Sequence, residues 1–138
     1  SHFLAGLDDA AIDIRIEQCV RAPTPQCDVI VEHLGGAIAD VRPEATAFFH
    51  RGAPFDLFIL GVWADLAQAE PCTRWVRGVT DAMAPFLAEG GYLNYMAETD
   101  GASERVRRAY GANYSRLADL KRQYDPTNFF RLNQNILP

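Results

Sequence analysis

The stretch that decides the fold class is Phe55-Asp56-Leu57-Phe58-Ile59-Leu60-Gly61-Val62-Trp63. This long apolar run predicts a β-strand. Side chains alternate between the two faces of a strand, so Asp56, Phe58, Leu60 and Val62 share one face, and Phe55, Leu57, Ile59 and Trp63 share the other. Both faces are apolar, which predicts that both are covered, and Asp56 is the exceptional polar residue on its face.

Further strands are predicted on both sides of this central run. One covers Cys27–Leu34, where β-branched residues lead to the glycine pair at 35–36, and a second covers Thr46–Arg51. A short strand is expected at Tyr92–Tyr95, directly after Gly90-Gly91. The linkers between the first three strands are short, which favours antiparallel pairing of successive strands.

Helices are predicted where apolar residues recur at helical spacing. The expected ranges are 8–21, 71–87, a helix from about Ser103 to Gly111, and a successor that carries Tyr114, Leu117 and Leu120 on one side. Asp125-Pro126 ends the last helix and begins a single turn through Phe130. The resulting fold class is α+β: a small antiparallel sheet covered by helices, with an irregular C-terminal tail.

Composition excludes several classes of function. The net charge of −5 argues against nucleic acid as a partner, because phosphate binding needs a concentrated basic surface. No apolar stretch approaches the roughly 20 residues that a membrane helix needs, so we expect no membrane contact. Three irregularly spaced cysteines, Cys19, Cys27 and Cys72, fit a reducing compartment, and we expect a cytoplasmic protein with no metal site.

The last third of the chain carries the most specific motifs. It contains Tyr92-Leu93-Asn94-Tyr95, then Tyr110-Gly111-Ala112-Asn113-Tyr114-Ser115-Arg116-Leu117, then Lys121, Asp125-Pro126-Thr127-Asn128-Phe129-Phe130-Arg131 and the closing Asn133-Gln134-Asn135-Ile136-Leu137-Pro138. In order and spacing these motifs resemble the C-terminal signature of bacterial berberine bridge enzyme-like, FAD-linked oxidoreductases. The resemblance covers roughly residues 28–138.

The resemblance implies a two-part organisation and a missing partner. Residues 1–91 would be part of a substrate-binding domain, and residues 92–138 would be the berberine-like segment that packs on a flavin domain. The flavin would be FAD, held by an N-terminal domain or separate flavin subunit outside this chain. We therefore expect a C-terminal fragment of the enzyme, and its alternative is a non-catalytic remnant or interaction module that lacks the FAD-binding half.

The resemblance also assigns candidate site residues. In the family the second tyrosine of the Tyr-x-Asn-Tyr motif often serves as the base, which places that role on Tyr95, while Tyr92 and Asn94 would contact the flavin. Glu32 and Asp56 are acidic candidates for the catalytic site, with a satisfied structural carboxylate as an equal alternative for Asp56. Strand alternation would put Tyr92 and Asn94 on one face and Tyr95 on another.

The reaction that the resemblance implies is oxidation of an alcohol, sugar or phenol-type small molecule by hydride transfer to flavin. Phenylalanines 48, 49, 55 and 58 suggest an apolar or ring-shaped substrate, with core packing as the alternative. We expect the isolated chain to be inactive, not to retain FAD, and to form a homodimer that hides an apolar face.

Overall fold

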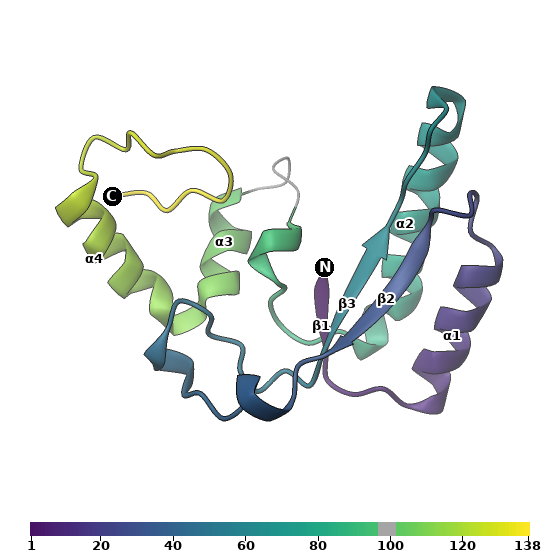
Figure 1. Ribbon diagram of the computed structural model, residues 1–138, viewed down its shortest axis with the longest axis horizontal. Helices are drawn as coiled ribbons and strands as arrows, with labels where there is room; N and C mark the ends of the chain where they lie inside the picture. The colour runs from purple at the N-terminus through teal and green to yellow at the C-terminus, as the bar shows by residue number, and fades with distance from the viewer. Residues whose placement is uncertain (97–101) are drawn as a thin grey trace.

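A three-stranded antiparallel sheet organises the N-terminal two-thirds of the chain. The computed structural model describes residues 1–96 and 102–138 (Figure 1). The strands are β1 (His2–Leu4), β2 (Asp28–His33) and β3 (Phe55–Leu60), in the spatial order β1-β3-β2. The helices α1 (Asp9–Val20) and α2 (Ala69–Met83) pack against one face of this sheet. The predicted α+β class with a small antiparallel sheet is confirmed.

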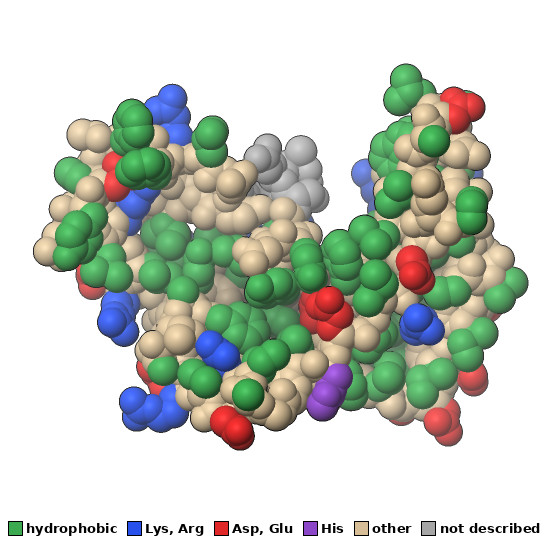
Figure 2. Space-filling view, in the orientation of Figure 1, with side chains coloured by type: hydrophobic (Ala, Val, Ile, Leu, Met, Phe, Trp, Pro, Cys, Tyr) green, Lys and Arg blue, Asp and Glu red, His purple; other side chains and the backbone are tan. Residues whose placement is uncertain are grey.

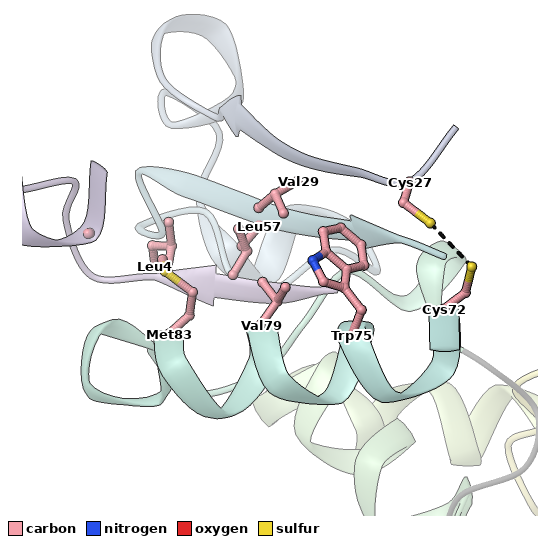
Figure 3. Packing of buried hydrophobic residues seen from close by; sticks show 9 residues of the cluster. Leu4, Cys27, Val29, Leu57, Cys72, Trp75, Val79 and Met83 are labelled. Carbon is pink, nitrogen blue, oxygen red and sulfur yellow. Dashed lines mark hydrogen bonds between the residues drawn. The ribbon is translucent and has the colours of Figure 1, made fainter. Parts of the chain in front are cut away.

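The hydrophobic core lies between the sheet and α2. Leu57 and Val29 point from the strands toward Trp75, Val79 and Met83, which follow one another along one side of α2 (Figure 3). The Trp75 indole Nε1 donates a hydrogen bond to the Gln18 carbonyl 3.0 Å away, which ties α2 to α1. The predicted alternation along the central strand holds, because Leu57 lies in this core while Asp56 faces the opposite side.

Strand β1 was not predicted. Three residues are too few to show an alternating pattern, yet His2, Phe3 and Leu4 pair with Leu57, Asp56 and Phe55. The backbone of Phe3 also accepts a hydrogen bond from the Ala88 N–H at 2.8 Å. The N-terminal residues therefore pair with the edge of β3 that β2 leaves free.

Two predicted strands are wrong. Thr46–Arg51 forms no strand, because side chains take the place of a strand partner for the carbonyls of this segment. Asn113 Nδ2 donates to the Thr46 carbonyl at 2.9 Å, and Arg51 Nε donates to the Phe48 carbonyl at 3.2 Å. Tyr92–Tyr95 is also not a strand: Leu93–Tyr95 forms a 3₁₀ turn that the Tyr95 N–H closes on the Tyr92 carbonyl at 3.0 Å.

The C-terminal part consists of helices α3 (Ala102–Tyr110) and α4 (Tyr114–Tyr124), joined by a 3₁₀ turn at Gly111–Asn113. They enclose a second, smaller apolar cluster formed by Val106, Tyr114 and Ala118. The predicted stripe is therefore only partly right, because Ala118 is buried whereas Leu120 is 41% exposed. The sequence also predicts that the Ser103 side chain caps α3, and this side chain is not among those that the structure describes. The remaining 3₁₀ turns are Gly36–Ile38, Pro43–Ala45, Leu66–Gln68 and Ala84–Phe86.

The tail after α4 is irregular, as predicted, and Asp125 anchors its beginning. The Asp125 carboxylate accepts hydrogen bonds from the backbone N–H groups of Phe129 at 2.7 Å and Phe130 at 3.1 Å. Lys121 forms an ion pair with the same carboxylate, and its hydrogen bond is the first cause of the lowered pKa of Asp125. The Asp-Pro motif therefore turns the chain back after α4, and the Phe129 and Phe130 side chains are left exposed.

Two negative findings apply to residues 1–96 and 102–138. No helix within these ranges is long and apolar enough to cross a membrane. No group of three or more histidine, cysteine, aspartate or glutamate side chains in the same ranges is arranged to hold a metal ion.

Candidate functional site

A cavity of about 400 Å³ lies on the face of the sheet that α1 and α2 leave free. Figure 2 shows acidic side chains beside apolar ones in the hollow between the sheet and the C-terminal helices. All three of the predicted catalytic residues line this cavity, together with Tyr92. The full lining is Glu32, Leu34, Ile38, Phe48, Arg51, Asp56, Tyr92 and Tyr95.

The two carboxylates are neighbours because of the strand register. Glu32 on β2 lies directly opposite Asp56 on β3 in the antiparallel pair, so both side chains project from the same face. Asp56 is only 1% exposed, whereas Glu32 is half-buried. Two acidic residues that are distant in the sequence therefore meet at one wall of the cavity.

The two carboxylate oxygens of Asp56 differ in their hydrogen bonding. The Ser1 hydroxyl donates to Asp56 Oδ1 at 2.6 Å and itself accepts the Tyr92 backbone N–H at 3.1 Å. Asp56 Oδ2 is buried without a hydrogen-bond partner among the described residues. Burial raises the pKa of Asp56, the Ser1 hydrogen bond works in the opposite direction, and the nearby Glu32 charge raises the pKa further. The Asp56 carboxyl group therefore takes up a proton more readily than an ordinary aspartate does.

Tyr95 lies in the 3₁₀ turn above these carboxylates. Its ring stacks on Phe58 with the centroids 4.1 Å apart and the planes 16° from parallel. Its hydroxyl donates a long hydrogen bond of 3.5 Å to Glu32 Oε1. The Glu32 charge is the main reason why the pKa of Tyr95 is raised, with burial and the Tyr92 and Asp56 groups adding to it. In this arrangement the phenol keeps its proton, which works against a free phenolate base.

Tyr92 and Asn94 form a pair beside this cluster. Asn94 Nδ2 donates to the Tyr92 hydroxyl at 2.9 Å. The predicted separation of Tyr95 from Tyr92 is wrong, because a 3₁₀ turn places residues i and i+3 over each other. The two tyrosine rings meet edge to face with centroids 5.1 Å apart. Asn94 is exposed and lines a neighbouring hollow of about 440 Å³ with Tyr110 and Gln134.

Two residues of the site were missed. Ser1 gave no signal, because a hydroxyl far from Asp56 in sequence becomes its partner only when β1 joins the sheet. Arg51 donates to the Phe48 and Ile38 carbonyls, and it also lines the cavity and lies over the Phe48 ring at 4.9 Å. Its neighbour His50 is not in the lining of this cavity, and its Nε2 lies 2.8 Å from the Arg108 carbonyl.

Comparison with known proteins shows which family this chain resembles. Residues 91–137 match the family described as berberine and berberine like. The FAD-linked oxidoreductase YgaK of Bacillus subtilis is 32% identical over 118 residues, which are 86% of this chain and 26% of YgaK. An FAD-linked oxidoreductase of Dictyostelium discoideum is 27% identical over 128 residues, 92% of this chain and 27% of its own length.

The fold comparison agrees with the sequence comparison. The solved structure of the glycopeptide hexose oxidase DBV29 complexed with teicoplanin superposes with a TM-score of 0.80 and 26% identity, over 99% of this chain and 31% of that chain. Together these matches support the assignment of the chain to the berberine bridge enzyme-like family of FAD-linked oxidoreductases. The chain spans only about a quarter to a third of the length of these relatives. The bacterial origin and the boundary at residue 91 stay predictions.

The cavity residues fit the FAD that the family uses. Asp56 Oδ2 is an unpartnered acceptor among the described residues, which an O–H or N–H group of a bound molecule would satisfy. The Tyr92 hydroxyl offers a polar contact beside the apolar surfaces of Phe48 and Ile38, and the exposed Asn94 amide, in the neighbouring hollow, is hydrogen-bonded to that hydroxyl. A planar ring with polar edges needs this combination of surfaces.

Proposed function

We propose that this chain supplies the side chains that accept the substrate's proton in the substrate cavity of an FAD-dependent oxidoreductase. The observation that supports this most directly is the meeting of Tyr95, Glu32 and Asp56 on one side of a single cavity. Tyr92 and Asn94 would hold the flavin ring, and FAD when bound supplies the hydride acceptor. The substrate would be an alcohol, a sugar or a phenol-type molecule.

Tyr95 acts in this proposal as a proton relay. A substrate hydroxyl gives its proton to the Tyr95 oxygen while the phenol proton passes to Glu32 Oε1, with which it is already hydrogen-bonded. The raised pKa of Tyr95 is compatible with this route, because the phenolate never has to exist as a stable species. Asp56, whose pKa is raised by burial, is positioned opposite Glu32 and takes part in sharing the proton.

Ring-shaped substrates suit the lining of the cavity. Phe48 and Tyr92 meet edge to face at 5.9 Å, and Tyr95 stacks on Phe58, so aromatic faces border the carboxylates. Aromatic faces pack on the apolar faces of rings, while carboxylates accept hydrogen bonds from their hydroxyl groups. The similarity to a glycopeptide hexose oxidase favours a sugar or a sugar-bearing molecule within this class.

The test of the proposal is replacement of Glu32 by glutamine in the flavin-loaded protein. Glutamine keeps the size of the side chain but removes the charge that receives the proton. We expect the rate of flavin reduction by substrate to fall by roughly 10- to 10²-fold, the worth of one charge-assisted hydrogen bond of about 1.5–3 kcal/mol. Stopped-flow absorbance under anaerobic conditions measures this rate.

Asp56→Asn serves as the companion variant. It should also slow flavin reduction or displace its pH profile, because the raised pKa of the Asp56 carboxyl is then lost. Glu17→Gln on the exposed face of α1 is the matched control, since it makes the same change far from the cavity lining, and it should leave the rate unchanged. Wild-type rates and pH profiles in both cavity variants would remove the carboxylates from the mechanism.

The partner that we propose is a flavin-binding domain or subunit outside these 138 residues. The exposed side chains of Phe129, Phe130 and Leu132, which are 75–84% accessible, would pack on it. The same exposure favours the alternative of an interaction module without turnover. The Glu32→Gln variant distinguishes the enzyme from the interaction module, because only the enzyme needs the Glu32 carboxylate for its activity.

The chain alone is expected to be colourless and to form a homodimer. Few of its residues could touch FAD, so most of the cofactor would remain in water and could not offset its lost freedom. The exposed aromatic tail would be covered by self-association, for which twofold symmetry is the usual arrangement. Absorbance of the purified chain and light scattering measure both properties. Stoichiometric flavin, or a monomer at all concentrations, would contradict the respective expectation.

A further inference from the structure

Two buried thiols face each other at the end of the sheet that lies away from the cavity carboxylates. Cys27 directly precedes β2 and Cys72 lies in the first turn of α2, and their sulfur atoms are 3.6 Å apart (Figure 3). Both cysteines are free thiols in this structure, 7% and 0% exposed. Two thiols in van der Waals contact need only a small movement to form a bond of about 2.05 Å.

The surroundings of the two sulfurs differ. The Thr24 hydroxyl lies 3.3 Å from Cys27 Sγ, and its single proton is shared between this sulfur and the nearer Val62 carbonyl at 2.8 Å. Burial works to raise the pKa of Cys27, but its contacts with Thr24, Val62 and Cys72 together outweigh burial, so the pKa of this thiol is lowered. Burial raises the pKa of Cys72. Cys27 has the lower pKa and is also the less completely buried residue, so we expect it to react with an oxidant first.

We propose that Cys27 and Cys72 form a reversible disulfide when the protein meets a peroxide. Cys27 attacks the peroxide, which leaves a sulfenic acid on Cys27 and releases one water. The Cys72 sulfur then attacks the Cys27 sulfur, the S–O bond breaks, and a second water leaves with the Cys72 proton. Hydrogen peroxide gains two electrons, and the two thiols lose two electrons and two protons. The proposal does not depend on the flavin chemistry.

The bond would join the segment that leads into β2 to the first turn of α2. It closes a loop from residue 27 to residue 72 that contains β2 and β3, and so restricts the unfolded chain. The junction lies beside the pair Asp28 and Leu60, at the other end of the ladder from Glu32 and Asp56. Oxidation should therefore raise the melting temperature by on the order of 10 °C and leave the cavity unchanged.

The experiment uses the protein purified under reducing conditions and exposed to hydrogen peroxide. The three cysteines fall in separate tryptic peptides: residues 16–21 hold Cys19, 22–51 hold Cys27, and 52–74 hold Cys72. The middle peptide extends to Arg51 because Arg42 precedes Pro43 and resists cleavage. We expect peptides 22–51 and 52–74 to appear as one linked species, about 2 Da lighter than their sum. Dithiothreitol should separate them again and reverse the gain in melting temperature.

Cys19→Ser is the matched control. Cys19 is half-buried and its sulfur lies 4.0 Å from an Asp28 oxygen, so this variant should form the same link with the same thermal shift. In Cys72→Ala, Cys27 should progress to a sulfinic acid, and the thermal shift should be absent. A sulfinic acid on Cys27 of the wild type beside a free Cys72, or a link that includes Cys19, would overturn the proposal. The wild-type map decides the matter even if Cys72→Ala does not fold.

Discussion

Tyr95→Phe in the flavin-loaded protein is expected to retain the flavin and to lower the rate of flavin reduction by substrate on the order of 10²- to 10⁴-fold. The substitution removes one oxygen atom, and with it the link between a substrate hydroxyl and Glu32. The phenylalanine ring can keep its stacking on Phe58, so the cavity should retain its shape. Anaerobic stopped-flow absorbance gives the rate, and the flavin spectrum reports whether the cofactor is retained.

Tyr124→Phe is the matched control for this prediction. It removes the same oxygen from a tyrosine that is 76% exposed at the end of α4, and it should leave flavin reduction unchanged. If Tyr95→Phe reduces its flavin at the wild-type rate, proton transfer does not pass through Tyr95. If only Glu32→Gln is slow, the carboxylate takes the proton directly from the substrate and Tyr95 is a positioning residue.

Trp75→Ala is expected to destabilise the protein by about 3–5 kcal/mol, the usual cost of removing a large buried aromatic side chain. Trp75 is 9% exposed, lies between α2 and the sheet, and donates the indole hydrogen bond to the Gln18 carbonyl of α1. The loss is a large share of the roughly 5–15 kcal/mol that typically separates folded from unfolded states. The free energy of unfolding from urea titration measures it.

Val20→Ala is the corresponding control, because Val20 is apolar and lies in the adjoining helix but is 83% exposed. Its free energy of unfolding should change by no more than about 0.5 kcal/mol. A Trp75→Ala protein within about 1 kcal/mol of the wild type would mean that the core between α2 and the sheet contributes little to stability. The assignment of these residues as the principal core would then be wrong.

Much of the fold could be predicted because the relevant signals are local. The apolar run at 55–63 indicates a strand, and the recurrence of Trp75, Val79 and Met83 indicates one buried helix face, wherever the segments later pack. The segments 46–51 and 92–95 were mistaken for strands because their short apolar and aromatic runs fit more than one conformation. In the folded protein, side chains from distant parts of the chain, such as Asn113, form hydrogen bonds with the backbone that a strand partner would otherwise form.

By itself, the sequence determined the family resemblance, the fold class and the set of candidate residues, because motifs and periodicity are properties of the chain in order. The grouping of those residues depended on tertiary structure. Glu32 faces Asp56 only through the register of β2 and β3, and Ser1 reaches Asp56 only because β1 joins the sheet. The raised pKa values of Asp56 and Tyr95 follow from this grouping, since burial and neighbouring charge exist only in the folded protein.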